Sequence, residues 1–179
     1  MRQLMLYSLL LCLVACQPLV VKDASSPYYL PPLGSMLVLN RQITIPPNSL
    51  SVYLQYGKIL SAKDVDAYQA NCKFELRNFS ETERQVAPDQ FEITKIQRTT
   101  DIVLYRPMTV AMLGMMSDGD APMAEIYSTT FYLHSPSQPQ VLYLTCQHWD
   151  EPTTGNHLNL NQIHQALGDI MRIEVESKG

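Results

Sequence analysis

Hydrophobic and polar residues alternate along much of this chain, which is the period of β-strands that bury one face. The clearest example is the stretch "NCKFELRNF", where Cys72, Phe74 and Leu76 share one face and Lys73 and Glu75 share the other. Four further runs are rich in branched and aromatic residues, as strands are. They are "SMLVLNRQITI" (35–45), "LSVYLQYGKIL" (50–60), "QFEITKI" (90–96) and "TDIVLY" (100–105).

Two later runs predict a long β-hairpin. The stretches "EIYSTTFYLH" (125–134) and "QVLYLTCQHW" (140–149) are separated by "SPSQP" (135–139), which has the composition of a turn. Leu144 and Cys146 share a face of the second run, as Cys72 and Phe74 do in the earlier strand. We therefore expect both cysteines to point into the core from different strands.

The end of the chain has a different pattern. In "NLNQIHQALG" the residues Leu160, Ile163 and Leu167 recur at helical spacing. Asn159 can cap the start of this helix and Gly168 can end it. Alternation returns in "IMRIEVE" (170–176), so we expect a short helix followed by a final strand.

Together these patterns predict one mainly β domain at residues 34–179. The spacing of the apolar runs fits a β-sandwich or a partly open barrel of about seven or eight strands. One short helix near the C-terminus should cover part of it. Without the first residues the chain keeps about 160 residues, which is enough for one domain with a substantial core.

The first residues form a short apolar run after the basic residue Arg2. Twelve residues, Leu4 to Ala15, would reach only about 18 Å as a helix, whereas a bilayer span needs about 20 residues. A run of this length is typical of a secretory signal. Its end, Leu13-Val14-Ala15-Cys16, resembles the lipobox of bacterial lipoproteins, in which a branched apolar residue and two small or apolar residues precede the cysteine.

This resemblance implies a processed and lipidated chain. Residues 1–15 would be the signal peptide, and Cys16 would become the acylated first residue of the mature protein. Gln17 is not acidic, which in the lipoproteins of Gram-negative bacteria suggests the outer membrane. The resemblance therefore predicts a protein anchored in the outer membrane by its lipid and facing the periplasm. The match covers the first 17 residues and implies nothing about the folded part.

The segment that follows the lipobox cysteine is rich in proline and serine. From residue 17 to 34 it reads "QPLVVKDASSPYYLPPLG", with few signals of regular structure. We interpret residues 16–33 as the lipidated cysteine and a flexible tether between membrane and domain. Tyr28 and Tyr29 are either solvated or docked on the domain surface.

The chain has four cysteines, of which Cys12 lies in the signal and Cys16 would carry lipid. Cys72 and Cys146 remain, and in the oxidising periplasm they predict a disulfide. Two separate buried thiols and a redox couple are the alternatives, although no Cys-x-x-Cys spacing supports the redox couple.

Methionines cluster in "MTVAMLGMMSDGDAPM", which contains five of the nine in the chain. Thioethers are ligands for Cu(I), and they also form adaptable contact surfaces. In a strand, residues four apart are about 13 Å distant and cannot share an ion, whereas a helix would bring some together. This segment is therefore a candidate copper site or an exposed contact patch, with candidate residues Met108, Met112, Met115, Met116 and Met123.

Charge and motifs reduce the number of functions that fit the sequence. The formal net charge is −4 and no basic patch is present, which argues against nucleic acid as a partner. We found no Gly-x-Ser-x-Gly elbow, no zinc-protease pair of histidines and no other catalytic constellation. We therefore predict no cofactor, and a non-enzymatic binding or envelope-assembly role with another envelope protein as partner. Copper or small-ligand binding and an envelope hydrolase are the alternatives.

Overall fold

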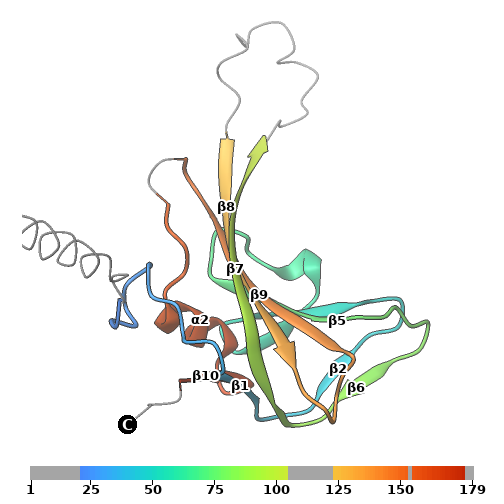
Figure 1. Ribbon diagram of the computed structural model, residues 1–179. Helices are drawn as coiled ribbons and strands as arrows, with labels where there is room; N and C mark the ends of the chain where they lie inside the picture. Colours follow the sequence, from blue (N-terminus) through green and yellow to red (C-terminus); the bar gives the residue numbers. More distant parts are fainter. Residues whose placement is uncertain (1–20, 105–122, 153–154, 176–179) are drawn as a thin grey trace, which may run out of the picture.

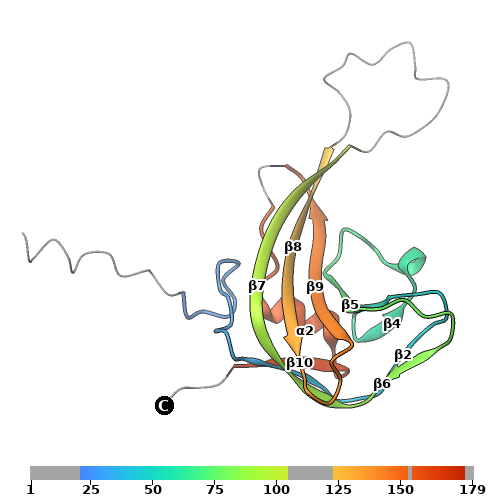
Figure 2. The same ribbon diagram turned by 45° about the vertical axis from the view of Figure 1, so that its right-hand side comes forward.

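The computed structural model of the chain describes residues 21–104, 123–152 and 155–175. These residues form a mainly β fold in which one sheet of eight strands curls into a half-barrel (Figures 1 and 2). Among these described residues, the single α-helix is short and lies near the C-terminus. The predicted fold class is therefore confirmed, as a partly open barrel.

The main sheet has the strand order β10-β1-β7-β8-β9-β5-β3-β4, and every pairing that it contains is antiparallel. A separate two-stranded sheet consists of β2 and β6. The strands are β1 (Met36–Leu39), β2 (Ile43–Ile45), β3 (Ser51–Gln55), β4 (Lys58–Leu60), β5 (Asn71–Leu76), β6 (Arg84–Val86), β7 (Asp89–Leu104), β8 (Met123–His134), β9 (Val141–Asp150) and β10 (Met171–Glu174). A short 3₁₀ helix, Ala62–Asp64, follows β4.

Alternation along the strands places one set of side chains in the core on the concave side of the sheet. Phe74 of β5, Leu144 of β9 and Phe131 of β8 are directly opposite one another in the register and are almost completely buried. Register shifts interrupt β7 between Ile93 and Lys95 and also interrupt β5. Such irregularities increase the local bend and twist of a strand, which helps a sheet to curl.

Helix α2 (Leu160–Leu167) packs at the open side of the half-barrel and buries Leu160, Ile163, Ala166 and Leu167. The side chain of Asn159 accepts a hydrogen bond from the Gln162 backbone amide, and the Gln162 side chain bonds back to the Asn159 amide. This capping box satisfies two backbone donors at the start of the helix. The predicted helix, with its first and last residues, is confirmed.

The segment before β1 lies on the domain. The carbonyl of Ala24 accepts a hydrogen bond from the Leu160 amide at 3.2 Å, and that of Tyr29 accepts one from the Arg98 side chain at 3.0 Å. Ala24 and Tyr29 also pack against the hydrophobic core. We expected a flexible tether up to residue 33, but contacts with the domain begin near residue 24.

Two features of the sheet differ from the sequence prediction. Residues 90–96 and 100–105 were predicted as separate runs, whereas β7 continues from Asp89 to Leu104. Strand β6 was not predicted, and it pairs with β2 outside the main sheet. Polar residues such as Gln97 and Thr99 interrupt the apolar pattern of β7, but the strand continues because β8 pairs along it to Leu104.

The end of α2 depends on a close contact between two glycines. Gly168 has a positive φ of 57°, and a Cβ added there would lie 2.4 Å from the Cα of Gly57. The Gly57 amide also donates a hydrogen bond to the carbonyl of Ala166 at 3.0 Å. Backbone therefore meets backbone where the β3–β4 turn contacts the helix end.

We predict that Gly168→Ala lowers the free energy of unfolding by at least about 2 kcal/mol, because it adds backbone strain and a clash with Gly57. Gly34→Ala is the matched control, since Gly34 also has a positive φ but a Cβ there would meet nothing within 4 Å. Urea unfolding of both variants measures the difference. Equal losses for the two variants would show that the Gly57 contact is unimportant.

Candidate functional site

The structure bears on only some of the residues that the sequence analysis selected. Cys16, Met108, Met112, Met115 and Met116 lie outside the described residues. Met123 is the first residue of β8, but its side chain also lies outside the description. The proposed lipid anchor and the proposed copper or contact site therefore stay predictions.

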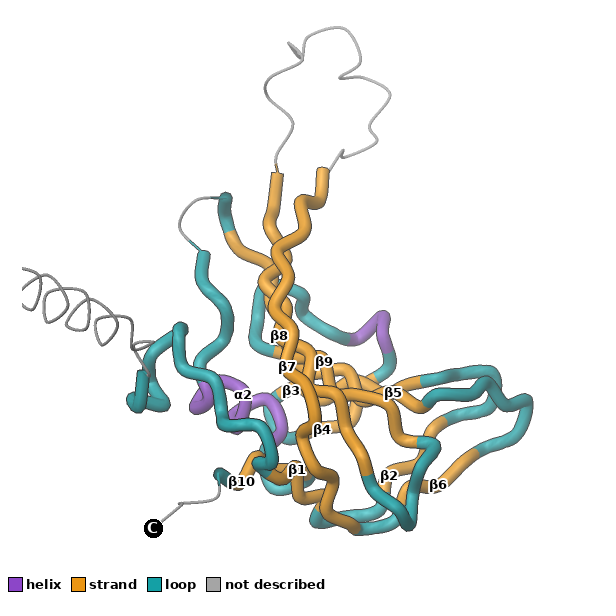
Figure 3. The backbone as a smooth tube through the Cα atoms, in the orientation of Figure 1, coloured by secondary structure: helices purple, strands orange, loops and turns teal. Residues whose placement is uncertain are grey.

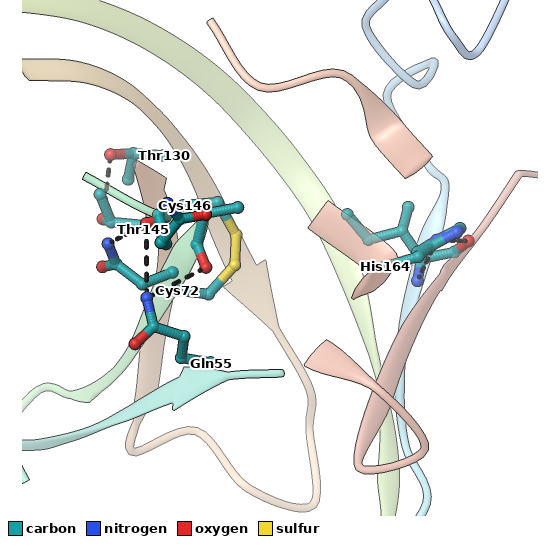
Figure 4. The surroundings of a disulfide bond; sticks show 10 residues. Gln55, Cys72, Thr130, Thr145, Cys146 and His164 are labelled. Carbon is teal, nitrogen blue, oxygen red and sulfur yellow. Dashed lines mark hydrogen bonds between the residues drawn. A yellow bond between two sulfur atoms is a disulfide. The ribbon is translucent and has the colours of Figure 1, made fainter. Parts of the chain in front are cut away.

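The predicted disulfide is present. Cys72 and Cys146 are bonded, both are completely buried, and they lie directly opposite each other on β5 and β9 (Figure 4). Close by, the buried Gln55 side chain donates a hydrogen bond to the Asp66 carbonyl at 2.8 Å and accepts one from the Asp66 amide at 3.1 Å. Complete burial keeps reductants away from the sulfurs, so the bond has a structural role rather than that of an exposed redox couple.

The most prominent feature of the fold is an arm that extends from the half-barrel. We define the arm as residues 99–104 of β7 and 123–128 of β8, which pair in continuous register. Strand β9 pairs with β8 only as far as Glu125, which faces Asp150. The tip of the arm is therefore a two-stranded ribbon, which rises beyond the rest of the sheet in Figures 1 and 2 and twists in Figure 3.

One edge of the arm is open. Strand β1 pairs only with Asp89–Glu92 of β7, and Ile93 then exchanges backbone hydrogen bonds with Gly34 and Ser35. Beyond Ile93, no other strand among the described residues pairs with this edge. The Arg98 side chain donates a hydrogen bond to the carbonyl of Tyr29, so among the described residues we take the open stretch of this edge as Thr99 to Leu104.

A cluster of polar, mostly titratable side chains lies at the base of the arm on the concave face of the sheet. We call it the base cluster, and Tyr127 of β8 is at its centre. The Tyr127 ring stacks on the imidazole of His148 at 5.9 Å between centroids and meets that of His157 edge-on at 5.6 Å. The other members are Arg98, Glu125, Thr129 and Asp150.

The loop that follows β9 covers this cluster. A Cβ added to Gly155 would lie 2.3 Å from the Tyr127 ring, so the backbone of Gly155 rests directly against that ring. The same loop carries His157 and leads into α2. Tyr127 is only 8 % exposed as a result, and its hydroxyl donates a hydrogen bond to the Glu125 carboxylate.

Burial sets the charge state of the cluster. It lowers the pKa of His157, and the charge of Arg98 and repulsion from His148 when that ring is protonated lower it further. Burial also lowers the pKa of His148, although Asp150, whose carboxylate lies 3.7 Å from the ring, favours protonation. The hydrogen bond to Glu125, together with burial, raises the pKa of Tyr127 to about 12. Both imidazoles and the phenol are therefore neutral near pH 7.

Four polar atoms of the cluster are buried without a hydrogen-bond partner among the described residues. They are Nε of Arg98, Oγ1 of Thr129 and the Nδ1 atoms of His148 and His157. Such groups are usually satisfied by protein or by water. The described residues contain no group of three or more His, Cys, Asp or Glu side chains placed to hold a metal.

The sequence analysis did not select this cluster. Nothing in the spacing of His148 and His157 requires them to meet, and the structure brings them to two sides of Tyr127. Arg98 and Tyr127 were not selected, because each lies in an ordinary strand pattern far from the histidines in sequence. Their common inward face on neighbouring strands was a signal, but only the register of β7 with β8 brings them together.

Comparisons with protein-family models, with curated proteins and with solved structures found no match to this chain. Within the residues that the structure describes, none of the helices has the length and apolar character needed to cross a bilayer. The function must therefore be argued from the geometry of the arm and its base.

We predict that the protein loses stability as the pH falls from about 7 to about 5, because His148 and His157 have lower pKa values folded than unfolded. Once the pH falls to the ordinary histidine pKa of about 6.5, these two histidines bind protons in the unfolded chain. In the folded cluster they bind protons only at lower pH, so protonation favours the unfolded chain. The loss is complete once the pH is below the folded pKa values. Urea midpoints at several pH values measure this effect.

The control is a pair of variants. His157→Asn should flatten the pH dependence between about pH 7 and 5, whereas replacement of the exposed His134 by Asn should leave it unchanged. Asp89 titrates below this pH range. Burial raises its pKa, but hydrogen bonds from Ser137, Gln138 and Ser135 outweigh burial and lower the pKa to about 2. An identical pH profile for both variants and the wild type would contradict the prediction.

Proposed function

We propose that this protein is a periplasmic lipoprotein of the outer membrane that binds another envelope protein and has no enzymatic activity of its own. Cys16 provides the anchor, and the open edge of the arm, Thr99–Leu104 of β7, provides the binding site. The partner adds an extended strand to this edge. The observation that carries the proposal is an edge of β7 that no described strand pairs with, on a strand that extends beyond its sheet.

An unpaired strand edge presents backbone donors and acceptors in a regular row. Proteins normally blunt such edges with short strands, bulges, charges or a cover, because an open edge pairs readily with another chain. The edge from Thr99 to Leu104 lacks a covering strand among the described residues, and Ile102 is 64 % exposed on it. An added strand would satisfy the backbone groups and cover this isoleucine.

The base cluster supports a binding role for the arm. The Tyr127 ring of β8 stacks on the His148 ring of β9, and the loop that carries Gly155 and His157 covers them. Backbone pairing of β7 with β8 and of β8 with β9 continues through the same level of the sheet, so a strand added to the arm would pair with a preorganised edge. Preorganisation reduces the entropy lost on binding.

The alternatives have less support. Copper binding depends on methionines outside the described residues, and a titration of the protein with Cu(I) remains its direct test. A small polar ligand has one observation in its favour, the four unpaired buried atoms of the base cluster. A hydrolase would need a nucleophile beside a base, or two carboxylates that face each other across a cleft.

The anchor is tested by metabolic labelling. We predict that the wild-type chain incorporates radioactive palmitate and that Cys16→Ser does not, because the lipobox thiol is the acylated group. Cys72→Ser is the control for loss of a cysteine elsewhere, and it should still be labelled even if it folds poorly. Equal labelling of wild type and Cys16→Ser would remove the lipoprotein part of the proposal.

Strand addition is tested by site-specific photo-crosslinking in cells. We predict that crosslinkers at Thr99 and Asp101 capture the same partner protein. The linked residues in that partner should lie two positions apart, because side chains on one face of a strand recur every second residue. Mass spectrometry of the linked peptides measures the spacing.

A crosslinker at Gln85 is the matched control, since Gln85 is exposed on β6 in the separate small sheet. It should not capture the partner that the arm captures. Adducts from Thr99 and Asp101 with unrelated proteins, or at scattered positions of one protein, would show that the arm does not bind a strand.

A further inference from the structure

A long uncharged stretch follows the segment that we assign to the membrane anchor. From Ala24 to Asn40 the sequence contains no Asp, Glu, Lys or Arg residue. Within it, Tyr28 is 71 % exposed, Leu30 41 % and Leu33 64 %. Three large apolar or amphipathic side chains therefore face solvent within six residues, which is unusual for an ordinary surface segment.

This stretch is part of the domain surface rather than a free strand. The carbonyl of Tyr29 accepts from Arg98, and the Asn159 side chain donates to the carbonyl of Ser25 at 3.0 Å. At its other end, the Gly34 amide donates to the carbonyl of Ile93 at 3.0 Å. The exposed side chains between these points are therefore presented from a backbone that is held at both ends.

The last residue of the surface, Val175, directly follows the C-terminal strand β10. Glu174 of β10 faces Met36 of β1 in the register, so Val175 comes next to Ser35 and close to the end of the stretch. Val175 is 38 % exposed. We define the apolar surface as Tyr28, Leu30, Leu33 and Val175.

Chain length places this surface close to the lipid, if Cys16 is the anchor that we propose. Val21, where the described chain begins, comes five positions after Cys16. Fully extended, five steps of the chain span at most about 18 Å. Contacts with the domain begin at Ala24, only a few residues later. The anchor therefore holds this side of the domain within a short distance of the bilayer.

We propose that the apolar surface docks on the membrane interface, so that the domain lies against the bilayer instead of extending away from it on a tether. Tyrosine and leucine side chains suit the boundary between headgroups and acyl chains. The lack of charge from Ala24 to Asn40 avoids the cost of dehydrating ionised groups. The surface takes lipid of any headgroup, because it contains no cluster of basic residues that would select anionic ones.

This orientation leaves the arm available. In Figures 1 and 2 the segment that precedes β1 lies beside α2 and β10, and the arm rises away from it beyond Arg98, where Tyr29 of the segment accepts a hydrogen bond. A strand partner can therefore bind the arm while the apolar surface rests on lipid. Docking rests on the proposed anchor, but it does not depend on strand addition.

The test uses the full lipidated chain reconstituted into phosphatidylcholine vesicles that contain a brominated phosphatidylcholine. The chain has one tryptophan, so Trp149→Phe gives a background without tryptophan fluorescence. Into this background we place Leu33→Trp in the apolar surface or Phe79→Trp as the control. Phe79 is 60 % exposed, similar to Leu33, and belongs to the β5–β6 loop on the far side of the molecule from the segment before β1.

We expect bromine to quench the Leu33→Trp fluorescence severalfold more than that of Phe79→Trp. Equal quenching of the two, or none for Leu33→Trp in protein that floats with the vesicles, overturns docking and leaves the anchor intact. Protein that does not float with vesicles overturns the anchor and docking together. Circular dichroism of each variant confirms that it is folded before quenching is compared.

Discussion

Pairing of β5 with β9 joins two parts of the main sheet. On one side of it are β3 and β4, and on the other are β8, β7, β1 and β10. The residues that meet there are far apart in sequence, since Cys72 and Cys146 are separated by 74 positions. Bringing them together costs conformational entropy of the chain. In the chain-entropy model the disulfide reduces this cost of folding by about 4 kcal/mol, because it restricts the unfolded chain.

Packing at the same junction explains why the sheet curls around one core. Phe74, Leu144 and Phe131 form a row across β5, β9 and β8 on the concave side, and Phe91 meets Phe74 edge-on from β7. Helix α2 closes part of the opening, with its end fixed by the contact between Gly57 and Gly168. A half-barrel can therefore bury a continuous core although its sheet does not close.

Because the sheet does not close, it has exposed strand edges, and the two outermost are each protected from pairing with another chain in a different way. At one edge, β10 is short, and Nε2 of His164 lies 3.2 Å from the carbonyl and 3.3 Å from the amide of Ile173 (Figure 4). The opposite edge strand, β4, has three residues. The stretch Thr99–Leu104 of β7 is different, because no described strand pairs with its outer edge and it belongs to a long strand of 16 residues. This contrast between blunted edges and one open edge is why we place the binding role on the arm.

The amino-acid sequence by itself determined which residues point inward on β5 and β9, where the helix begins and ends, and which two cysteines share the core. These features follow from local periodicity and from local capping bonds, which need no distant partner. Only the tertiary structure decided that β7 is one continuous strand, that β2 pairs with β6, and that residues 24–33 lie on the domain. It also brought Arg98 and Tyr127 to the two histidines. Strand register, loop docking and side-chain clusters of this kind depend on contacts between residues distant in sequence, and a local pattern does not specify the partner.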